Sequence, residues 1–112
     1  MKVHIIGGGN LGVSIALGLS KFSSDNQVTI TRRNTASIQY LEKLGTTVST
    51  NNIHQIQEAD VIILTIKPYQ VDAVLAEILP VISNKIIASA VSGLSIENLQ
   101  NKIGDANTAI RI

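Results

Sequence analysis

Three glycines near the amino terminus carry the strongest chemical signal in the sequence. They have the spacing G-x-G-x-x-G, directly after a β-branched run and at the start of an amphipathic stretch. In such a turn the glycines allow a sharp bend, a close approach of phosphates to the backbone, and close packing of a helix against a strand. The free N–H groups and the positive end of that helix attract anions. The predicted pyrophosphate site consists of Gly7, Gly8, Gly9, Asn10, Leu11 and Gly12.

The alternative is a glycine-rich turn that serves only packing. Gly7, Gly8 and Gly9 are consecutive, and three glycines in a row are costly in backbone entropy, so a functional or structural reason for them is expected. Their place between a predicted strand and a predicted helix favours dinucleotide binding, because the fingerprint requires this context.

Two arginines occupy the position at which dinucleotide-binding domains distinguish NAD from NADP. In NAD-selective domains an acidic side chain about twenty residues after the glycines accepts hydrogen bonds from the ribose 2′-OH. Here Arg32 and Arg33 stand at that place, and the nearest acid, Asp25, precedes the predicted strand and lies at the wrong end of the sheet. Guanidinium groups can bind a 2′-phosphate in a bidentate manner. We therefore expect NADP(H) to be preferred over NAD(H); the alternative is two solvated arginines on an exposed loop.

Three further loops follow predicted strands. Asn52 comes after the third strand, Lys67-Pro68 after the fourth, and Val91-Ser92-Gly93 after the fifth. Ligands of open α/β sheets bind outside the carboxyl ends of the strands, so these loops should line the same cleft. Lys67 ends an otherwise buried strand, and its ammonium should point into the cleft mouth or toward water. An ordinary surface lysine is the alternative.

Strand-like and helix-like segments alternate along the whole sequence. Short β-branched or apolar runs predict strands at 3–6, 27–31, 46–49, 61–66, 85–90 and 108–112. The run at 61–66 is nearly all apolar, as expected of a central strand that helices cover on both faces. We therefore expect an α/β fold with a doubly wound, Rossmann-like parallel sheet of about six strands, helices on both faces and right-handed crossovers.

Apolar residues at helical spacing predict the intervening helices. These are expected at 11–22, 38–44, 69–79 and 95–102, with a single helical turn at 53–57. Asn34 and Gly45 are the expected caps of the second helix, and Ser95 is the expected N-cap of the last.

Composition and charge limit the classes of partner. The 112 residues suit one domain, and nine basic against eight acidic side chains give a net charge of +1 without a block of like charges. No nucleic-acid or membrane partner is therefore expected, and a small molecule is. Cysteine is absent, which excludes disulfides and thiolate metal sites. With no signal-peptide core before the glycines and no apolar run of membrane-spanning length, we expect a cytoplasmic protein.

Four motifs together resemble the N-terminal half of pyrroline-5-carboxylate reductases, which make proline by reducing a cyclic imine with NAD(P)H. They are I-G-G-G-N-L-G from Ile6, A-D-V-I-I-L-T-I-K-P from Ala59, S-A-V-S-G-L-S-I from Ser89 and A-I-R-I from Ala109. The strand that ends in Lys-Pro is the most specific of them. The cofactor contacts that this resemblance implies are Gly7 to Gly12, Arg32, Arg33, Asn52, Thr65, Ile66, Lys67, Pro68, Val91, Ser92 and Gly93.

The sequence departs from this family in two ways. The family usually has small alanines where Val91 and Ser92 precede Gly93, which affects the nicotinamide loop. Family members also continue past the last strand with a Met-Pro-Asn-Thr-Pro-like segment and a helical C-terminal domain, which supplies the dimer interface and much of the imine pocket. The resemblance implies that this chain is a truncated form, or a natural remnant, of a longer homo-oligomeric reductase.

No proton donor for an imine nitrogen is evident. We expect His4 to be a half-buried packing residue in the first strand, and nothing in the sequence orients His54. Glu58 and Asp60 precede a buried strand and should lie at the opposite edge of the sheet. There is no carboxylate pair, metal-ligand cluster or Ser-His-Asp set, so we assign no catalytic residue and no metal. The chain should bind cofactor and turn over substrate poorly or not at all.

Two other classes of function remain open. One is a different reductase with a similar first domain, such as a deazaflavin-dependent NADP reductase or a β-hydroxyacid dehydrogenase. The Lys67-Pro68 pair argues against these. The other is a non-catalytic module that senses NADP(H).

Overall fold

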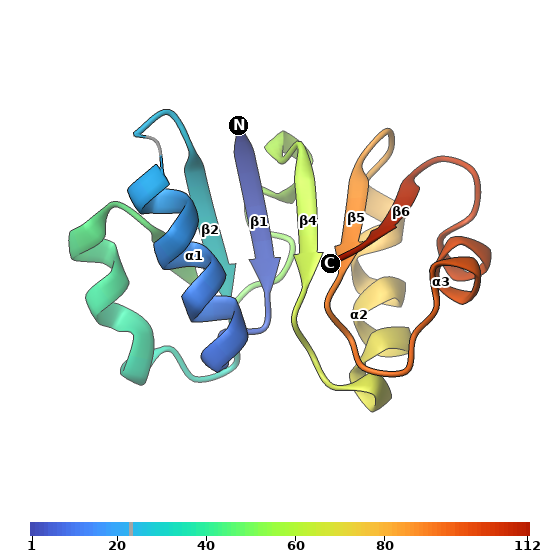
Figure 1. Ribbon diagram of the computed structural model, residues 1–112, viewed down its shortest axis with the longest axis horizontal. Helices are drawn as coiled ribbons and strands as arrows, with labels where there is room; N and C mark the ends of the chain where they lie inside the picture. Colours follow the sequence, from blue (N-terminus) through green and yellow to red (C-terminus); the bar gives the residue numbers. More distant parts are fainter. Residues whose placement is uncertain (23) are drawn as a thin grey trace.

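The protein contains one parallel six-stranded sheet in the order β3-β2-β1-β4-β5-β6 (Figure 1). The computed structural model describes residues 1–22 and 24–112. The strands are β1 (Lys2–Ile6), β2 (Gln27–Thr31), β3 (Thr47–Ser49), β4 (Val61–Leu64), β5 (Ile86–Ser89) and β6 (Thr108–Arg111). Every pair of neighbouring strands is parallel. The predicted doubly wound, Rossmann-like fold is thereby confirmed, because the strand order reverses between β1 and β4.

Helices of two kinds connect the strands. The α-helices are α1 (Asn10–Phe22), α2 (Val71–Ile78) and α3 (Ile96–Ile103), and the 3₁₀ helices are η1 (Ala36–Leu44), η2 (Ile56–Glu58), η3 (Pro68–Gln70) and η4 (Leu79–Val81). The single turn predicted at 53–57 is found as η2, three residues later than its predicted start. None of the helices in residues 1–22 and 24–112 is long and apolar enough to cross a membrane.

The predicted helix caps are confirmed at two of three places. Ser95 Oγ accepts a hydrogen bond from the Asn98 N–H at 3.0 Å, and Gly45 ends η1 with a left-handed φ of 90°. Asn34 lies one residue too early to be the N-cap of η1, which is Thr35. The Asn34 Oδ1 atom instead accepts from the Ala36 N–H at 3.0 Å, as a local turn ahead of the helix.

Most predicted elements differ from the structure by one or two residues at their ends, and the strand at 61–66 and the helix at 69–79 show why. The strand predicted to reach residue 66 ends at Leu64, because Thr65 turns its hydroxyl onto the glycine turn, as described below. The helix predicted at 69–79 divides into η3, α2 and η4, and Pro80 lies inside η4 rather than after the helix. Proline is accepted there because it occupies the first turn, where its missing N–H is not needed.

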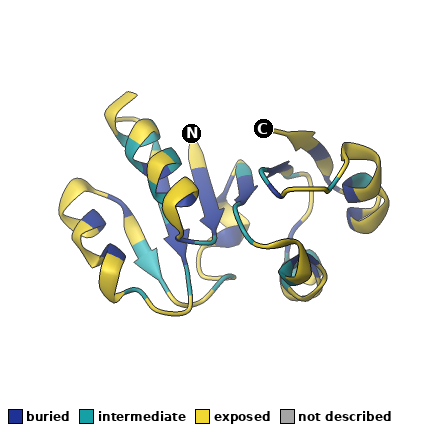
Figure 2. Ribbon diagram, turned by 60° about the horizontal axis from the view of Figure 1, so that its bottom comes forward, coloured by how far each residue is buried: buried dark blue, intermediate teal, exposed yellow. Residues whose placement is uncertain are grey.

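The core forms two apolar clusters, one on each face of the sheet. On one face α1 and η1 cover β1 and β2, with Ile5, Ile30 and Leu41 all 0% exposed. On the other face α2 and α3 cover the central and carboxyl-terminal strands. Figure 1 shows α1 and α2 on opposite sides of the sheet, and in Figure 2 the buried residues follow the strands while the helices turn an exposed side outward. Burial on both faces fixes the strand ends that carry the site.

Candidate functional site

A cleft of about 1020 Å³ opens at the carboxyl ends of the strands. The chain reverses its winding direction there, which is where open α/β sheets bind ligands. The cleft brings together most residues that the sequence predicts to contact a cofactor: Gly7, Gly8, Gly9, Asn10, Leu11, Arg32, Arg33, Asn52, Thr65, Ile66, Lys67, Pro68 and Ser92. Gly12, Val91 and Gly93 do not line it.

The glycine turn is tied to both neighbouring strands. The Gly7 N–H donates to the Thr31 carbonyl at 2.9 Å, and Thr65 Oγ1 donates to the Gly7 carbonyl at 2.6 Å. Gly7 has a φ of 105°, and a Cβ atom there would lie 2.6 Å from the Thr65 carbonyl oxygen. The turn is therefore a rigid support between β2 and β4.

Gly12 and Gly9, the other two glycines of the fingerprint, lie in different environments, one crowded and one open. A Cβ atom on Gly12 would collide with the Gly7 carbonyl oxygen and lie 2.8 Å from Thr65 Oγ1, so Gly12 lets α1 pack against the turn. A Cβ atom on Gly9 would meet nothing within 4 Å, and Gly9 is exposed to the cleft. Gly9 thus keeps open the space that a pyrophosphate would fill.

The amino-terminal end of α1 favours a negatively charged ligand. The helix begins at Asn10, runs for 13 residues and has no acidic residue in its first turn. The first N–H groups of a helix lack intrahelical partners and carry the positive end of the helix dipole. Nothing in the first turn competes with an anion for them.

Arg32 lies across the glycine turn. Its Nη1 atom donates to the Gly8 carbonyl at 2.9 Å and to Ser37 Oγ at 3.2 Å. Arg33 is exposed and also lines the cleft. The two ion pairs found in the described part of the chain, Lys2–Glu58 and Lys102–Asp72, involve neither arginine. The positive charge at the end of β2 is thus available to a ligand.

Asn52 is held from two sides. Thr31 Oγ1 donates to Asn52 Oδ1 at 2.6 Å, and His4 Nε2 donates to the Asn52 carbonyl at 2.8 Å. His4 is fully buried, beyond the half-buried position that its sequence context predicts. Burial lowers its pKa, the hydrogen bond to Asn52 opposes this shift, and the nearby charge of His54 adds to it.

The loops after β4 and β5 present different groups to the cleft. Lys67 is exposed at the rim, and its backbone exchanges two hydrogen bonds of 2.9 Å with Gln70, one of them to the Gln70 side chain. After β5 only Ser92 of the three predicted residues lines the cleft. Val91 is 3% exposed and packs into the core, because its N–H is turned onto Ser89 Oγ at 3.1 Å.

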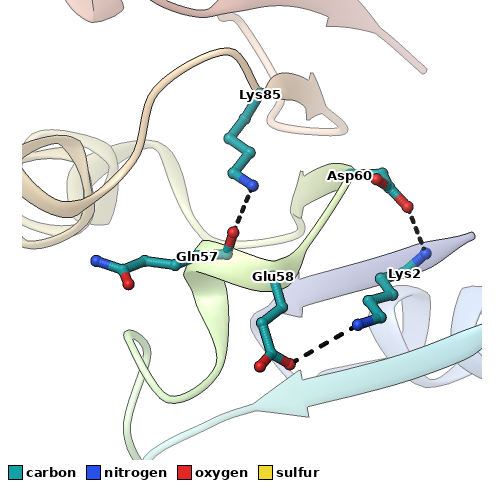
Figure 3. A network of polar contacts seen from close by, with 5 residues as sticks. All are labelled: Lys2, Gln57, Glu58, Asp60 and Lys85. Carbon is teal, nitrogen blue, oxygen red and sulfur yellow. Dashed lines mark hydrogen bonds and ion pairs between the residues drawn. The ribbon is translucent and has the colours of Figure 1, made fainter.

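The acidic residues before β4 lie at the opposite edge of the sheet, away from the cleft. Asp60 Oδ2 accepts from the Lys2 N–H at 2.8 Å, and Glu58 stands 4.0 Å from the Lys2 ammonium (Figure 3). No group of three or more metal-ligating side chains occurs in the part of the chain that the structure describes.

A family model described as "NADP oxidoreductase coenzyme F420-dependent" matches residues 2–93. The chain belongs to this family. The description of this oxidoreductase family names NADP, which agrees with a nicotinamide-dinucleotide site at the glycine turn and with the strand order.

The chain is also similar to several pyrroline-5-carboxylate reductases. Pyrroline-5-carboxylate reductase 1 of Dictyostelium discoideum is 38% identical over 90% of this chain and 19% of its own length. The reductase of Staphylococcus saprophyticus is 33% identical over 100% of the chain and 43% of its own length. The solved reductase of Coxiella burnetii is 27% identical, with a TM-score of 0.86 over 97% of this chain and 42% of that one. The chain thus spans between 19% and 43% of the length of these relatives.

Several cleft residues escape sequence reasoning. The five residues Tyr69, Gln70, Ala73, Val74 and Glu77 line the cleft from η3 and α2. Their spacing is typical of any amphipathic helix. The sequence therefore does not show whether these residues face a cleft or open solvent. Thr31 and His4 carry a usable signal, because each is a polar residue inside a buried, β-branched strand.

Proposed function

We propose that this chain is the NADP(H)-binding domain of an enzyme that reduces a cyclic imine to proline, as pyrroline-5-carboxylate reductases do. The observation that carries the proposal is the cleft in which the glycine turn, the two arginines and the Lys-Pro loop meet. The relatives support the choice of substrate.

The residues of the cleft suit each part of a dinucleotide. The turn at 7–12 would hold the pyrophosphate, because Gly9 leaves room and α1 offers free N–H groups. Asn52, Lys67 and the exposed Ser92 would border the riboses and the nicotinamide. Thr65, Ile66 and Pro68 would support these contacts. Gly12 would act through the close packing of α1 against the turn, and Val91 and Gly93 through the shape of the loop after β5. When bound, the dinucleotide supplies the hydride for the reduction.

The preference for NADP(H) over NAD(H) is part of the proposal. Arg32 and Arg33 stand at the end of β2 without an acidic residue beside them to receive a ribose 2′-OH. A guanidinium favours a phosphate at that position through a charge-assisted bond. A solved relative from Plasmodium falciparum with NADP bound has the same fold, with a TM-score of 0.82 at 21% identity.

We further propose that the imine pocket and the proton source lie in a helical C-terminal domain like that of the longer reductases, which would also supply a homo-oligomer interface. No described residue of the cleft is a buried acid or a histidine directed into it. We place the protein in the cytoplasm, in keeping with a sequence that has no cysteine.

The description of the family favours a second candidate, hydride exchange between NADP(H) and coenzyme F420. The complete gene product should be assayed by NADPH oxidation with pyrroline-5-carboxylate and, separately, with oxidised F420. We expect oxidation only with the imine. Turnover with F420 alone would contradict the proposed imine substrate.

The sequence that follows Ile112 in the gene offers an independent check. A Met-Pro-Asn-Thr-Pro-like continuation would support the proposed imine reductase.

A further inference from the structure

A buried histidine holds the loop that brings Asn52 into the cleft. His4 lies in the middle of β1, between Thr29 of β2 and Ile62 of β4, and is 1% exposed. Its Nε2 atom is 2.8 Å from the backbone carbonyl oxygen of Asn52. A carbonyl oxygen can only accept a hydrogen bond, so Nε2 must carry the proton and donate.

A second hydrogen bond orients the Asn52 side chain. Thr31 Oγ1 donates to Asn52 Oδ1 at 2.6 Å, and the amide oxygen is thereby directed toward β2. Within residues 1–22 and 24–112, no hydrogen bond engages the amide nitrogen, and Asn52 is half-buried at the wall of the cleft. The two N–H bonds of that nitrogen are the groups that Asn52 can offer to a ligand.

His4 and Thr31 act from the same face of the sheet. Ile6 pairs with Thr31 in the register of β1 and β2, and His4 precedes Ile6 by two residues, so the side chains of His4 and Thr31 share one face. Both side chains donate to the same residue, one to its backbone and one to its side chain. Together they fix the position and the rotation of the Asn52 amide.

The far end of the Asn52 segment is anchored separately. Figure 3 shows Asp60 bonded to the Lys2 N–H at 2.8 Å and the Lys85 ammonium bonded to the Gln57 carbonyl at 2.6 Å. Between these anchors and Asn52, Gln55 adopts a left-handed φ of 61°, a strained backbone that needs surrounding contacts to hold it. Loss of the His4 bond would therefore leave the cleft end of the segment held only through the Asn52 side chain by Thr31, while the other end of the segment stays in place.

We propose that His4 is a positioning residue for the dinucleotide, which holds Asn52 so that its amide N–H groups donate to the cofactor in the cleft. This role presupposes the NADP(H) binding proposed above. His4 itself does not touch the cleft. It acts through one backbone hydrogen bond, and its imidazole fills a place that an aliphatic residue of similar volume could also fill.

The test compares two substitutions of His4 by calorimetric titration with NADPH. His4→Leu removes the hydrogen-bond donor. We expect the affinity for NADPH to fall roughly three- to tenfold, which corresponds to the contribution of one hydrogen bond. His4→Gln keeps an N–H donor at nearly the same distance from the backbone and should restore most of the affinity. Val3→Ala is the matched control, because Val3 is a neighbour in the same strand that packs into the opposite cluster. It should destabilise the fold and leave affinity unchanged.

A double-mutant cycle distinguishes a positioning role of His4 from a general loss of fold stability. In the Asn52→Ala background the His4→Leu change should have no further effect on NADPH affinity, because the amide that His4 positions is gone. Equal losses in both backgrounds, or equal affinities of the wild type and His4→Leu, would overturn the role of His4. A wild-type chain that binds neither NADPH nor NADH would instead overturn the proposed function.

A measurement on the unchanged protein keeps the proposal testable if His4→Leu does not fold. Nitrogen NMR of the imidazole should show the neutral tautomer protonated at Nε2, and addition of NADPH should shift the side-chain amide signals of Asn52. A neutral tautomer protonated at Nδ1, or Asn52 signals that do not respond to saturating NADPH, would contradict the proposal.

Discussion

Single residues decide how much room the glycine turn leaves. Gly9 faces open space, whereas a Cβ atom on Gly12 would collide with the Gly7 carbonyl. Two alanine substitutions three residues apart should therefore fail in different ways, one in binding and one in folding.

Gly9→Ala should fold normally and lose affinity for the dinucleotide, because its methyl group would occupy the space of the phosphates. Gly12→Ala should lower the free energy of unfolding by about 1–3 kcal/mol, as overpacking does elsewhere. Urea denaturation of both variants, followed by NADPH titration of the folded one, checks the pair. Equal stability of the two variants would contradict the packing role of Gly12.

Charge at the end of β2 should decide between the two dinucleotides. The double change Arg32→Asp and Arg33→Ala should reduce NADPH affinity by roughly ten- to a hundredfold, since charge-assisted hydrogen bonds contribute about 1.5–3 kcal/mol. Affinity for NADH should stay the same or rise. Lys43→Ala is a suitable control, because Lys43 is an exposed cation in η1 that does not line the cleft. Unchanged NADPH affinity in the double variant would refute the assignment of the arginines.

His4 should make stability depend on pH. Burial holds the pKa of His4 below its ordinary value of 6.5, so the folded state binds this proton more weakly than the unfolded state does. The free energy of unfolding is then highest above pH 6.5 and falls as the pH drops from that value toward the lowered pKa of the folded state. Urea denaturation of the wild type and of His4→Gln across this range should show that the variant loses this part of the dependence. Identical pH profiles would remove His4 as its cause.

At the scale of elements, hydrophobic periodicity predicted most of the fold. Residues 27–31 form β2 as predicted, and the other strands differ from prediction by one or two residues at their ends. Periodicity succeeds here because strands buried on both faces must be apolar. It does not distinguish a 3₁₀ helix from an α-helix, so the form of η1 was not predictable.

The candidate site was predictable only where a residue type has a special task. The glycines of the turn and Arg32 can be recognised from their residue type and their position in the sequence, and Gly7, Gly8, Gly9 and Arg32 line one cleft in the structure. The contribution of Tyr69 and Glu77 depends on how η3 and α2 lie over the strand ends, and this depends on tertiary packing that the local sequence does not determine. Val91 shows the reverse case, because its position after β5 predicts a cleft residue and its side chain is needed in the core.

The cap of α3 offers a test confined to one element. Ser95→Ala removes the acceptor of the Asn98 N–H and should cost about 1 kcal/mol of stability. Cofactor affinity should not change, because no residue of α3 lines the cleft. Ser95→Asp should keep the cap and serve as the control in thermal denaturation. A weaker binding of NADPH by a folded Ser95→Ala protein would show coupling between α3 and the cleft that the structure does not predict.

At the scale of the whole molecule, the order of the strands creates the cleft. The sheet winds outward from β1 and β4 in opposite directions, so the carboxyl ends of its central strands diverge into a space large enough for a dinucleotide. The oxidoreductase family to which the chain belongs fits this architecture. Dinucleotide binding is therefore a property of the domain itself, whereas imine reduction is proposed for the longer protein.

Calorimetric titration of the chain with NADPH and with NADH tests the central claim most directly. We predict saturable binding of NADPH at one site for each chain, with NADH at least tenfold weaker because it lacks the 2′-phosphate that Arg32 and Arg33 would bind. Equal binding of the two would contradict the role of the arginines alone. Failure to bind either dinucleotide would contradict the account of the glycine turn and the cleft.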